Sequence, residues 1–125
     1  MPHKANMTKP IEIPIFEWTT DVETGDGKFY FKVTSNLDGF KLTKAEGTVI
    51  TAGTTGSTDV QIHNVNEAVD MLSSKIAIPS AGTSHTGTIN VPNSGVSEGD
   101  LLRVDFDSVS STAPKGFILI LEFEE

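Results

Sequence analysis

The residues best suited to bind a metal ion are three carboxylates close together in the sequence, Asp21, Glu23 and Asp26. Oxygen ligands in a glycine-containing turn suit Ca²⁺. An EF-hand loop, however, alternates acidic or amide groups before a glycine and ends on a later glutamate, and Gly25 stands at one of those alternate positions. Aspartate and glycine are also ordinary turn residues. The sequence therefore predicts a turn here and no metal site.

Catalytic groups are not indicated either. Asp105 and Asp107 share one face of an expected strand, but a glycosidase needs its second carboxylate across a cleft, and outward carboxylates on a strand are ordinary solvation. His63 and His85 lie in or beside polar segments without a clustered partner, which indicates surface histidines. The G-x-S-x-G elbow of hydrolases and the phosphate-binding glycine loop are absent. We therefore predict a non-enzymatic protein with no catalytic residues and no cofactor.

Two aromatic residues, Trp18 and Tyr30, have side chains that could stack on a sugar ring. A lone tryptophan in a β domain lies more often in a core or an interface. We therefore expect Trp18 to lie in such a contact rather than in a sugar site.

The charge of the chain restricts its partners. Seventeen acidic and nine basic residues give a net charge of −8, which repels nucleic acid and anionic membranes. The chain has no cysteine, so disulfides and thiol chemistry are excluded. No apolar run has the length of a signal peptide or a membrane span. We therefore expect neither a nucleic-acid nor a membrane partner.

The elements that position these residues are expected to be short β-strands. Glycine, serine and threonine separate short alternating apolar runs, and no window keeps the apolar spacing of a helix. In the run 28–34, for example, Phe29, Phe31 and Val33 face inward, while the lysines and the tyrosine between them face outward. Further strands are expected near residues 40–42, 48–52, 60–62, 72–78, 88–91, 102–106 and 116–123, with loops at 79–87 and 92–99 and a connection at 64–71. Such spacing is typical of an all-β, two-sheet antiparallel sandwich or jelly roll.

The first 24 residues differ from the remainder, so we divide the chain into an extended N-terminal arm, residues 1–24, and a β-sandwich domain, residues 25–125. Prolines at positions 2, 10 and 14 remove backbone donors, which favours an extended arm over a central strand. Apolar side chains fall on both sides of this arm, so both sides need a partner, and one of them could be another chain. They are Ile11, Ile13 and Ile15 on one side and Phe16 and Trp18 on the other.

The last expected strand, residues 116–123, is also apolar on both faces. Four of its residues, at 117, 119, 121 and 123, alternate with Ile118 and Ile120. Two apolar faces indicate either a central strand of a sheet or a contact between subunits through Ile118 and Ile120.

Five segments of the chain carry a resemblance to a known group of proteins. They are GDGK at 25–28, ITAGTTGSTDVQI at 50–62, VDMLS at 69–73, LLRVDFD at 101–107 and SSTAPKG at 110–116. Together they resemble a recurrent module of the structural proteins of tailed bacteriophages, over residues 25–123. The resemblance implies a virion protein, which could be a decoration protein, a head fibre or a tail-associated protein. It implies no set of catalytic residues.

A chain of one module and an arm lacks the long shaft or repeats of a fibre. We therefore expect a capsid decoration, or cement, protein, made in the host cytoplasm and located on the outer surface of the mature capsid. The arm residues Ile11, Ile13, Ile15, Phe16 and Trp18 are expected to bind the major capsid protein as an added strand or wedge. A homotrimer would match local three-fold positions of a shell.

The alternative is a head-fibre or tail-associated module that binds a receptor or a carbohydrate. The serine, threonine and glycine residues of the expected loop 81–87 would then present adaptable hydrogen-bonding groups at one end of the sandwich.

Overall fold

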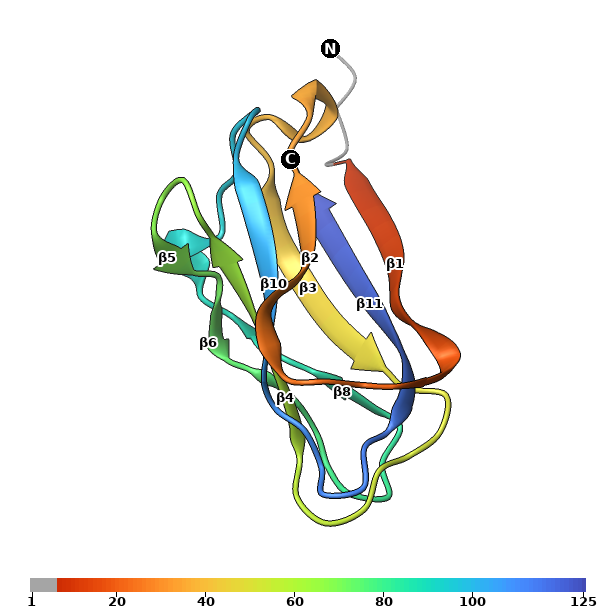
Figure 1. Cartoon of the computed structure of the whole chain (residues 1–125). Helices are drawn as coiled ribbons and strands as arrows, with labels where there is room; N and C mark the ends of the chain where they lie inside the picture. The colour runs from red at the N-terminus through yellow and green to blue at the C-terminus, as the bar shows by residue number, and fades with distance from the viewer. Residues whose placement is uncertain (1–6) are drawn as a thin grey trace.

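The computed structural model of the chain describes residues 7–125, so residues 1–6 of the expected arm lie outside the described residues. Antiparallel β-sheets pack face to face (Figure 1), which confirms the expected all-β sandwich. Helical structure in the described part consists of two short 3-10 turns, η1 (Ser35–Leu37) and η2 (Val91–Asn93). None of the helices in residues 7–125 has the length and apolar character needed to cross a membrane.

Two sheets form the layers of the sandwich. The first has the strand order β1-β11-β3-β8, with β1 (Thr8–Asp21), β11 (Lys115–Glu124), β3 (Lys41–Thr48) and β8 (Ser84–Thr86). The second has the order β2-β10-β4-β5, with β2 (Gly25–Lys32), β10 (Leu101–Ser108), β4 (Thr58–Asn64) and β5 (Val69–Asp70), and β7 (Ile76–Ile78) also pairs with β4. The strands β6 (Leu72–Ser74) and β9 (Thr88–Ile89) form a small third sheet.

The hydrophobic core lies between the two layers and follows from the two-residue period of the strands. Every second side chain of β11, from Phe117 to Phe123, is buried, as are Leu102, Val104 and Phe106 of β10. The ring of Phe106 makes edge-to-face contacts with Phe117 of the first sheet, at 4.8 Å between centroids, and with Phe16, at 5.3 Å. These three rings therefore join the layers.

Gly47 of β3 provides the space for this aromatic contact. A Cβ atom built on Gly47 would lie 2.6 Å from Cζ of Phe117, closer than real carbon atoms approach. The position therefore requires glycine for packing rather than for a turn.

Strand β1 is an edge strand that contributes to the core. It pairs with β11 in one register from Thr8 opposite Glu124 to Pro14 opposite Ile118, and the register then shifts so that Phe16 opposes Phe117. The shift leaves both Ile15 and Phe16 packed against the core, as an extra residue in one strand allows.

The prolines of β1 lie where they do not interrupt its pairing. The backbone N–H of Glu125 donates to the carbonyl oxygen of Met7 at 3.1 Å, so Met7 and the alternate residues that follow it exchange hydrogen bonds with β11. Pro10 and Pro14 have the other parity, and their nitrogen atoms face the open edge of the sheet. The ladder with β11 therefore loses no donor to either proline.

Some local expectations were wrong. The segment 48–52 was expected to be a strand of its own, but β3 ends at Thr48 and the chain continues as a loop. The expected loop 79–87 contains β8, which has no apolar residue and pairs with β3 through its backbone. The connection 64–71 contains β5, and the run 72–78 divides into β6 and β7 with different partners. Strands this short carry too few side chains for a periodic pattern.

The packing of β1 predicts a difference between two neighbouring residues. Ile13 is only 7 % exposed and opposes Leu119, whereas Glu12 is exposed. We expect Ile13→Ala to lower the free energy of unfolding by about 2–5 kcal/mol, because it leaves a cavity in the core. Glu12→Ala, the matched control, should change it by less than about 0.5 kcal/mol. Urea denaturation followed by circular dichroism measures both, and equal stability of the two variants would show that β1 is not packed on the domain.

Candidate functional site

The structure separates the five side chains that were predicted to bind a capsid. Ile11, Ile13, Ile15 and Phe16 pack against the chain's own core. Trp18 lies beyond the register shift of β1 and is 71 % exposed. Of the predicted set, Trp18 therefore remains the large apolar side chain free to contact another molecule.

The predicted oligomer residues Ile118 and Ile120 lie on the outer face of the first sheet. Strand β11 is central in this sheet, between β1 and β3 (Figure 1). The side chains that alternate with the buried ones point away from the second sheet, so Ile118 and Ile120 are half-buried among strand neighbours. Pro14 of β1 and Thr48 of β3 flank Ile118.

Trp18 and Ile50 extend this outer face. A Cβ atom built on Gly116 would lie 2.9 Å from Cα of Trp18 and 2.8 Å from Cγ1 of Ile50, so these two residues come together over Gly116. Gly116 precedes Ile118 by two residues, so Trp18 and Ile50 lie beside the end of β11 at which this outer face begins. Ile50 is 50 % exposed, and the sequence pattern gave no sign of its role, because only the pairing of β11 with its neighbours brings it to Trp18.

We call this surface the apolar face and define it by Pro14, Trp18, Ile50, Ile118 and Ile120. It joins β1, β11 and the loop after β3, segments far apart in the sequence. Tryptophan is the residue type most often found to dominate the binding energy of protein interfaces. Glu12 and Glu46 flank Ile120 in the sheet, so the exposed apolar side chains gather toward the Trp18 end of this face. Exposed apolar side chains gathered in this way are typical of an interaction site.

Charged side chains border the apolar face. At one end, the ammonium group of Lys44 lies 3.3 Å from Glu46 and 3.9 Å from Glu122. At the other end, Lys115 donates to Asp21 at 2.9 Å. The border has more carboxylates than ammonium groups, so it favours a partner that carries positive charge.

The candidate calcium ligands do not converge. Asp21 pairs with Lys115 and Glu23 with Lys28, the latter at 3.5 Å. Across residues 7–125, no group of three or more histidine, aspartate or glutamate side chains is placed to hold a metal ion.

The carboxylates of β10 are more closely bound than the sequence indicated. Asp105 was expected to be solvated, but it is only 5 % exposed and accepts two hydrogen bonds from Arg103, at 2.8 and 2.9 Å. This pairing raises the pKa of the Arg103 guanidinium. Asp107 lies 2.9 Å from Lys75 and raises the pKa of that ammonium group. Both carboxylates therefore take part in ion pairs.

The two histidines also have partners. His63 was expected to lack a clustered partner, and this expectation was wrong, because its Nδ1 atom lies 2.8 Å from Oδ1 of Asp70 on the neighbouring strand. His85 accepts a hydrogen bond from the backbone N–H of Ala77 at 2.9 Å through Nδ1, which connects β8 to β7.

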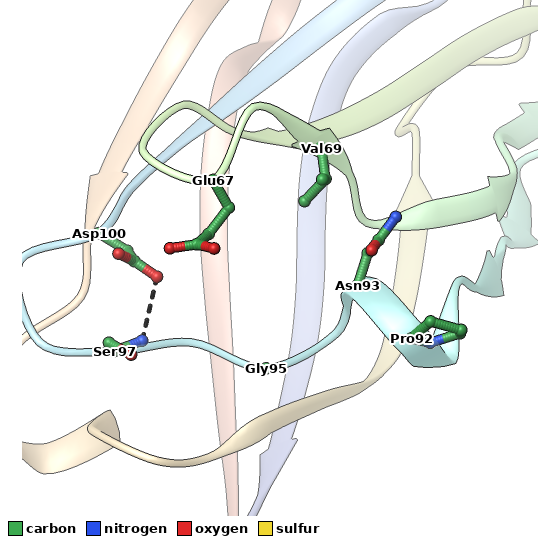
Figure 2. A pocket seen from close by; sticks show the side chains of 7 residues that line it. All are labelled: Glu67, Val69, Pro92, Asn93, Gly95, Ser97 and Asp100. Atoms are coloured by element: carbon green, nitrogen blue, oxygen red, sulfur yellow. Dashed lines mark hydrogen bonds between the residues drawn. The ribbon is translucent and has the colours of Figure 1, made fainter.

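A small polar pocket of about 210 Å³ lies by the connection between β4 and β5 (Figure 2). Its carboxylates are Glu67 and Asp100. Asp100 is buried, and one of its oxygen atoms accepts hydrogen bonds from the Ser97 N–H and from the Asn64 side chain, both at 3.0 Å. These hydrogen bonds hold the turn before β10 in place. The pocket is lined by Glu67, Val69, Pro92, Asn93, Gly95, Ser97 and Asp100.

Comparison with known proteins gives no family for the chain: no family model matches it, and no curated protein matches it. The apolar face is therefore assigned from the geometry of this chain.

Proposed function

We propose that this chain is a non-enzymatic virion protein of a tailed bacteriophage, which decorates the outer surface of the capsid and stabilises the shell. The observation that carries the proposal is the apolar face, on which Trp18 of β1 and Ile50 of the loop after β3 are exposed. The resemblance of residues 25–123 to a module of phage structural proteins supports a virion as the setting. Many modest contacts of this kind would reinforce a shell through multivalency.

The major capsid protein is the proposed partner of the apolar face. A second copy of this chain would bring the same carboxylate-rich border and another net charge of −8, so like charges would oppose the contact. A partner surface with an apolar centre and basic residues around it would complement both the apolar face and its carboxylate-rich border. The homotrimer expected from the sequence stays a prediction, and sedimentation velocity of the purified protein measures it.

In this proposal β1 stays in the sheet, and its outward side chains make the contact. Detaching β1 would expose four apolar side chains, each worth about 1.5–3 kcal/mol when fully buried. Both ends of the strand are also fixed. The Lys9 ammonium donates to the carbonyl oxygen of Asn36 at 2.9 Å and lies 5.1 Å from the centroid of the Phe40 ring. After its end, the Val22 N–H donates to the Pro114 carbonyl oxygen at 2.9 Å.

Removal of the exposed tryptophan tests the contact. We expect Trp18→Ala to weaken binding to capsids that lack this protein by about thirtyfold, as loss of a central aromatic side chain costs about 2 kcal/mol or more. Co-sedimentation of the purified variants with such capsids measures it. Because Trp18 is mostly outside the core, the unfolding midpoint of the Trp18→Ala variant should differ little from that of the wild type.

Tyr30→Ala is the matched control, since it removes another exposed aromatic ring from the opposite sheet. Equal capsid binding by the wild type and by Trp18→Ala would show that the apolar face does not make the contact. The copy number of the protein in purified particles, relative to the major capsid protein, tests the function itself. Absence from particles would refute a virion protein, and a few copies per particle would point to a fibre or tail position.

A reversible disulfide tests whether β1 stays in place. Thr8 and Glu124 oppose each other without exchanging hydrogen bonds, so their Cα atoms are expected to lie about 4.5 Å apart, within disulfide range. The chain has no cysteine, so Thr8→Cys with Glu124→Cys forms one defined bond. We expect the oxidised and reduced forms to bind capsids equally. Binding by the reduced form alone would mean that the arm leaves the sheet to reach the shell.

A further inference from the structure

Four polar side chains form a row across the outer face of the second sheet. Tyr30 of β2 opposes Arg103 of β10, Arg103 opposes His63 of β4, and His63 opposes Asp70 of β5. All four point away from the core, because the residues beside them in each strand are the core-facing ones. Adjacent strands lie about 4.8 Å apart, so the row is about 14 Å long.

The ring of Tyr30, at one end of the row, packs against the backbone of Gly27. The Tyr30 side chain is 53 % exposed, and its ring extends along β2 over Gly27, which has a positive φ of 69°. A Cβ atom built on Gly27 would lie 2.6 Å from Oη and 2.9 Å from Cε1 and Cζ of Tyr30. Glycine therefore lets the ring lie against the backbone with its other side open.

Asp105 follows Arg103 by two residues on the same face of β10, and it holds Arg103 and the glycine under Tyr30 in place. Its Oδ1 atom accepts a hydrogen bond from the Gly27 N–H at 2.9 Å and another from Nε of Arg103, and Oδ2 accepts one from Nη2. A carboxylate this deeply buried therefore fixes both the glycine under the tyrosine and the guanidinium beside it. The Nη1 atom of Arg103 takes no part in this pair and keeps its donors for a ligand.

At the other end of the row, His63 and Asp70 orient each other. The contact at 2.8 Å uses Nδ1 of the imidazole and Oδ1 of the carboxylate. The Nε2 atom of His63 and the Oδ2 atom of Asp70 are the remaining polar atoms of this pair. The Asp70 side chain is well exposed, so the end of the row is accessible.

We propose that this row, Tyr30-Arg103-His63-Asp70, is a binding site for a short oligosaccharide. An aromatic face flanked by planar polar groups in fixed orientations suits a pyranose, which has an apolar face of C–H groups and a rim of hydroxyls. Hydrogen-bond donors and acceptors of the protein are mixed along the row, which suits sugar hydroxyls that both donate and accept. The net charge of −8 opposes nucleic acid as the occupant.

The row and the apolar face lie on opposite layers of the sandwich. A molecule docked through the apolar face would therefore present the row to the surrounding solution. The site does not depend on that docking, however, because all four side chains belong to one sheet of a single chain.

A glycan microarray tests the proposal with the full-length protein. The array should carry bacterial O-antigen, capsular and peptidoglycan oligosaccharides together with mucin-type glycans. We expect retention of at least one group of related glycans, with affinity then measured by calorimetry on the free oligosaccharide. Tyr30→Ala should weaken it by about tenfold or more, since loss of a stacked ring costs about 1.4 kcal/mol. His63→Ala should also weaken it, while Tyr30→Phe should retain most of the affinity.

Trp18→Ala is the control for this experiment, because it removes an exposed ring from the other layer and should leave glycan affinity unchanged. Thermal unfolding of each variant checks that it is folded. Retention of no glycan would overturn the proposal, as would affinity that is equal in wild type and Tyr30→Ala. Retention of sulfated glycans alone, abolished by salt and indifferent to Tyr30→Ala, would show attraction by charge and would also overturn it. Each of these results is separate from capsid binding, which the Trp18→Ala variant reports.

Discussion

The contact of Phe106 with Phe16 and Phe117 is the interaction on which the architecture depends. It joins β10 of one sheet to β1 and β11 of the other, so it sets both the spacing of the layers and the position of the N-terminal strand. Because successive side chains of a strand alternate, fixing Phe106 inward also turns Asp105 outward, and fixing Phe117 inward turns Ile118 outward. The packing of the core therefore determines which side chains each outer face presents.

The two faces differ in chemistry, although they belong to the same small sandwich. The outer side of the first sheet is apolar around Trp18 and has a charged border. The outer side of the second sheet carries charged and aromatic groups, with the buried carboxylate of Asp105 beside them. Neither arrangement uses a deep cleft, and both use side chains supported by strands. This division suits a protein that is held by one surface and meets other molecules with the opposite one.

The sequence predicted the parts of the fold that depend on local periodicity. The alternation along β2, β10 and β11 identified the inward residues, and it indicated that Ile118 and Ile120 share the opposite face of their strand. Strand order is a long-range property, so the pairing of His63 with Arg103 and Asp70 had no local signal. The burial of Asp105 was missed for the same reason, because it depends on β2 and β4 lying on either side of β10. The assignment of residues 8–21 to the sheet likewise required the partner strand β11.

The prolines of β1 have a consequence for molecules held close together. An open strand edge offers N–H groups to which another chain can add a strand, and repeated addition leads to fibrils. On β1 the nitrogen atoms at Pro10 and Pro14 face that edge and carry no hydrogen, so a continuous intermolecular ladder cannot grow from it. The same residues that leave the pairing with β11 intact thus oppose polymerisation through this edge at high local concentration. A decoration protein crowded on a particle would need this property in every copy.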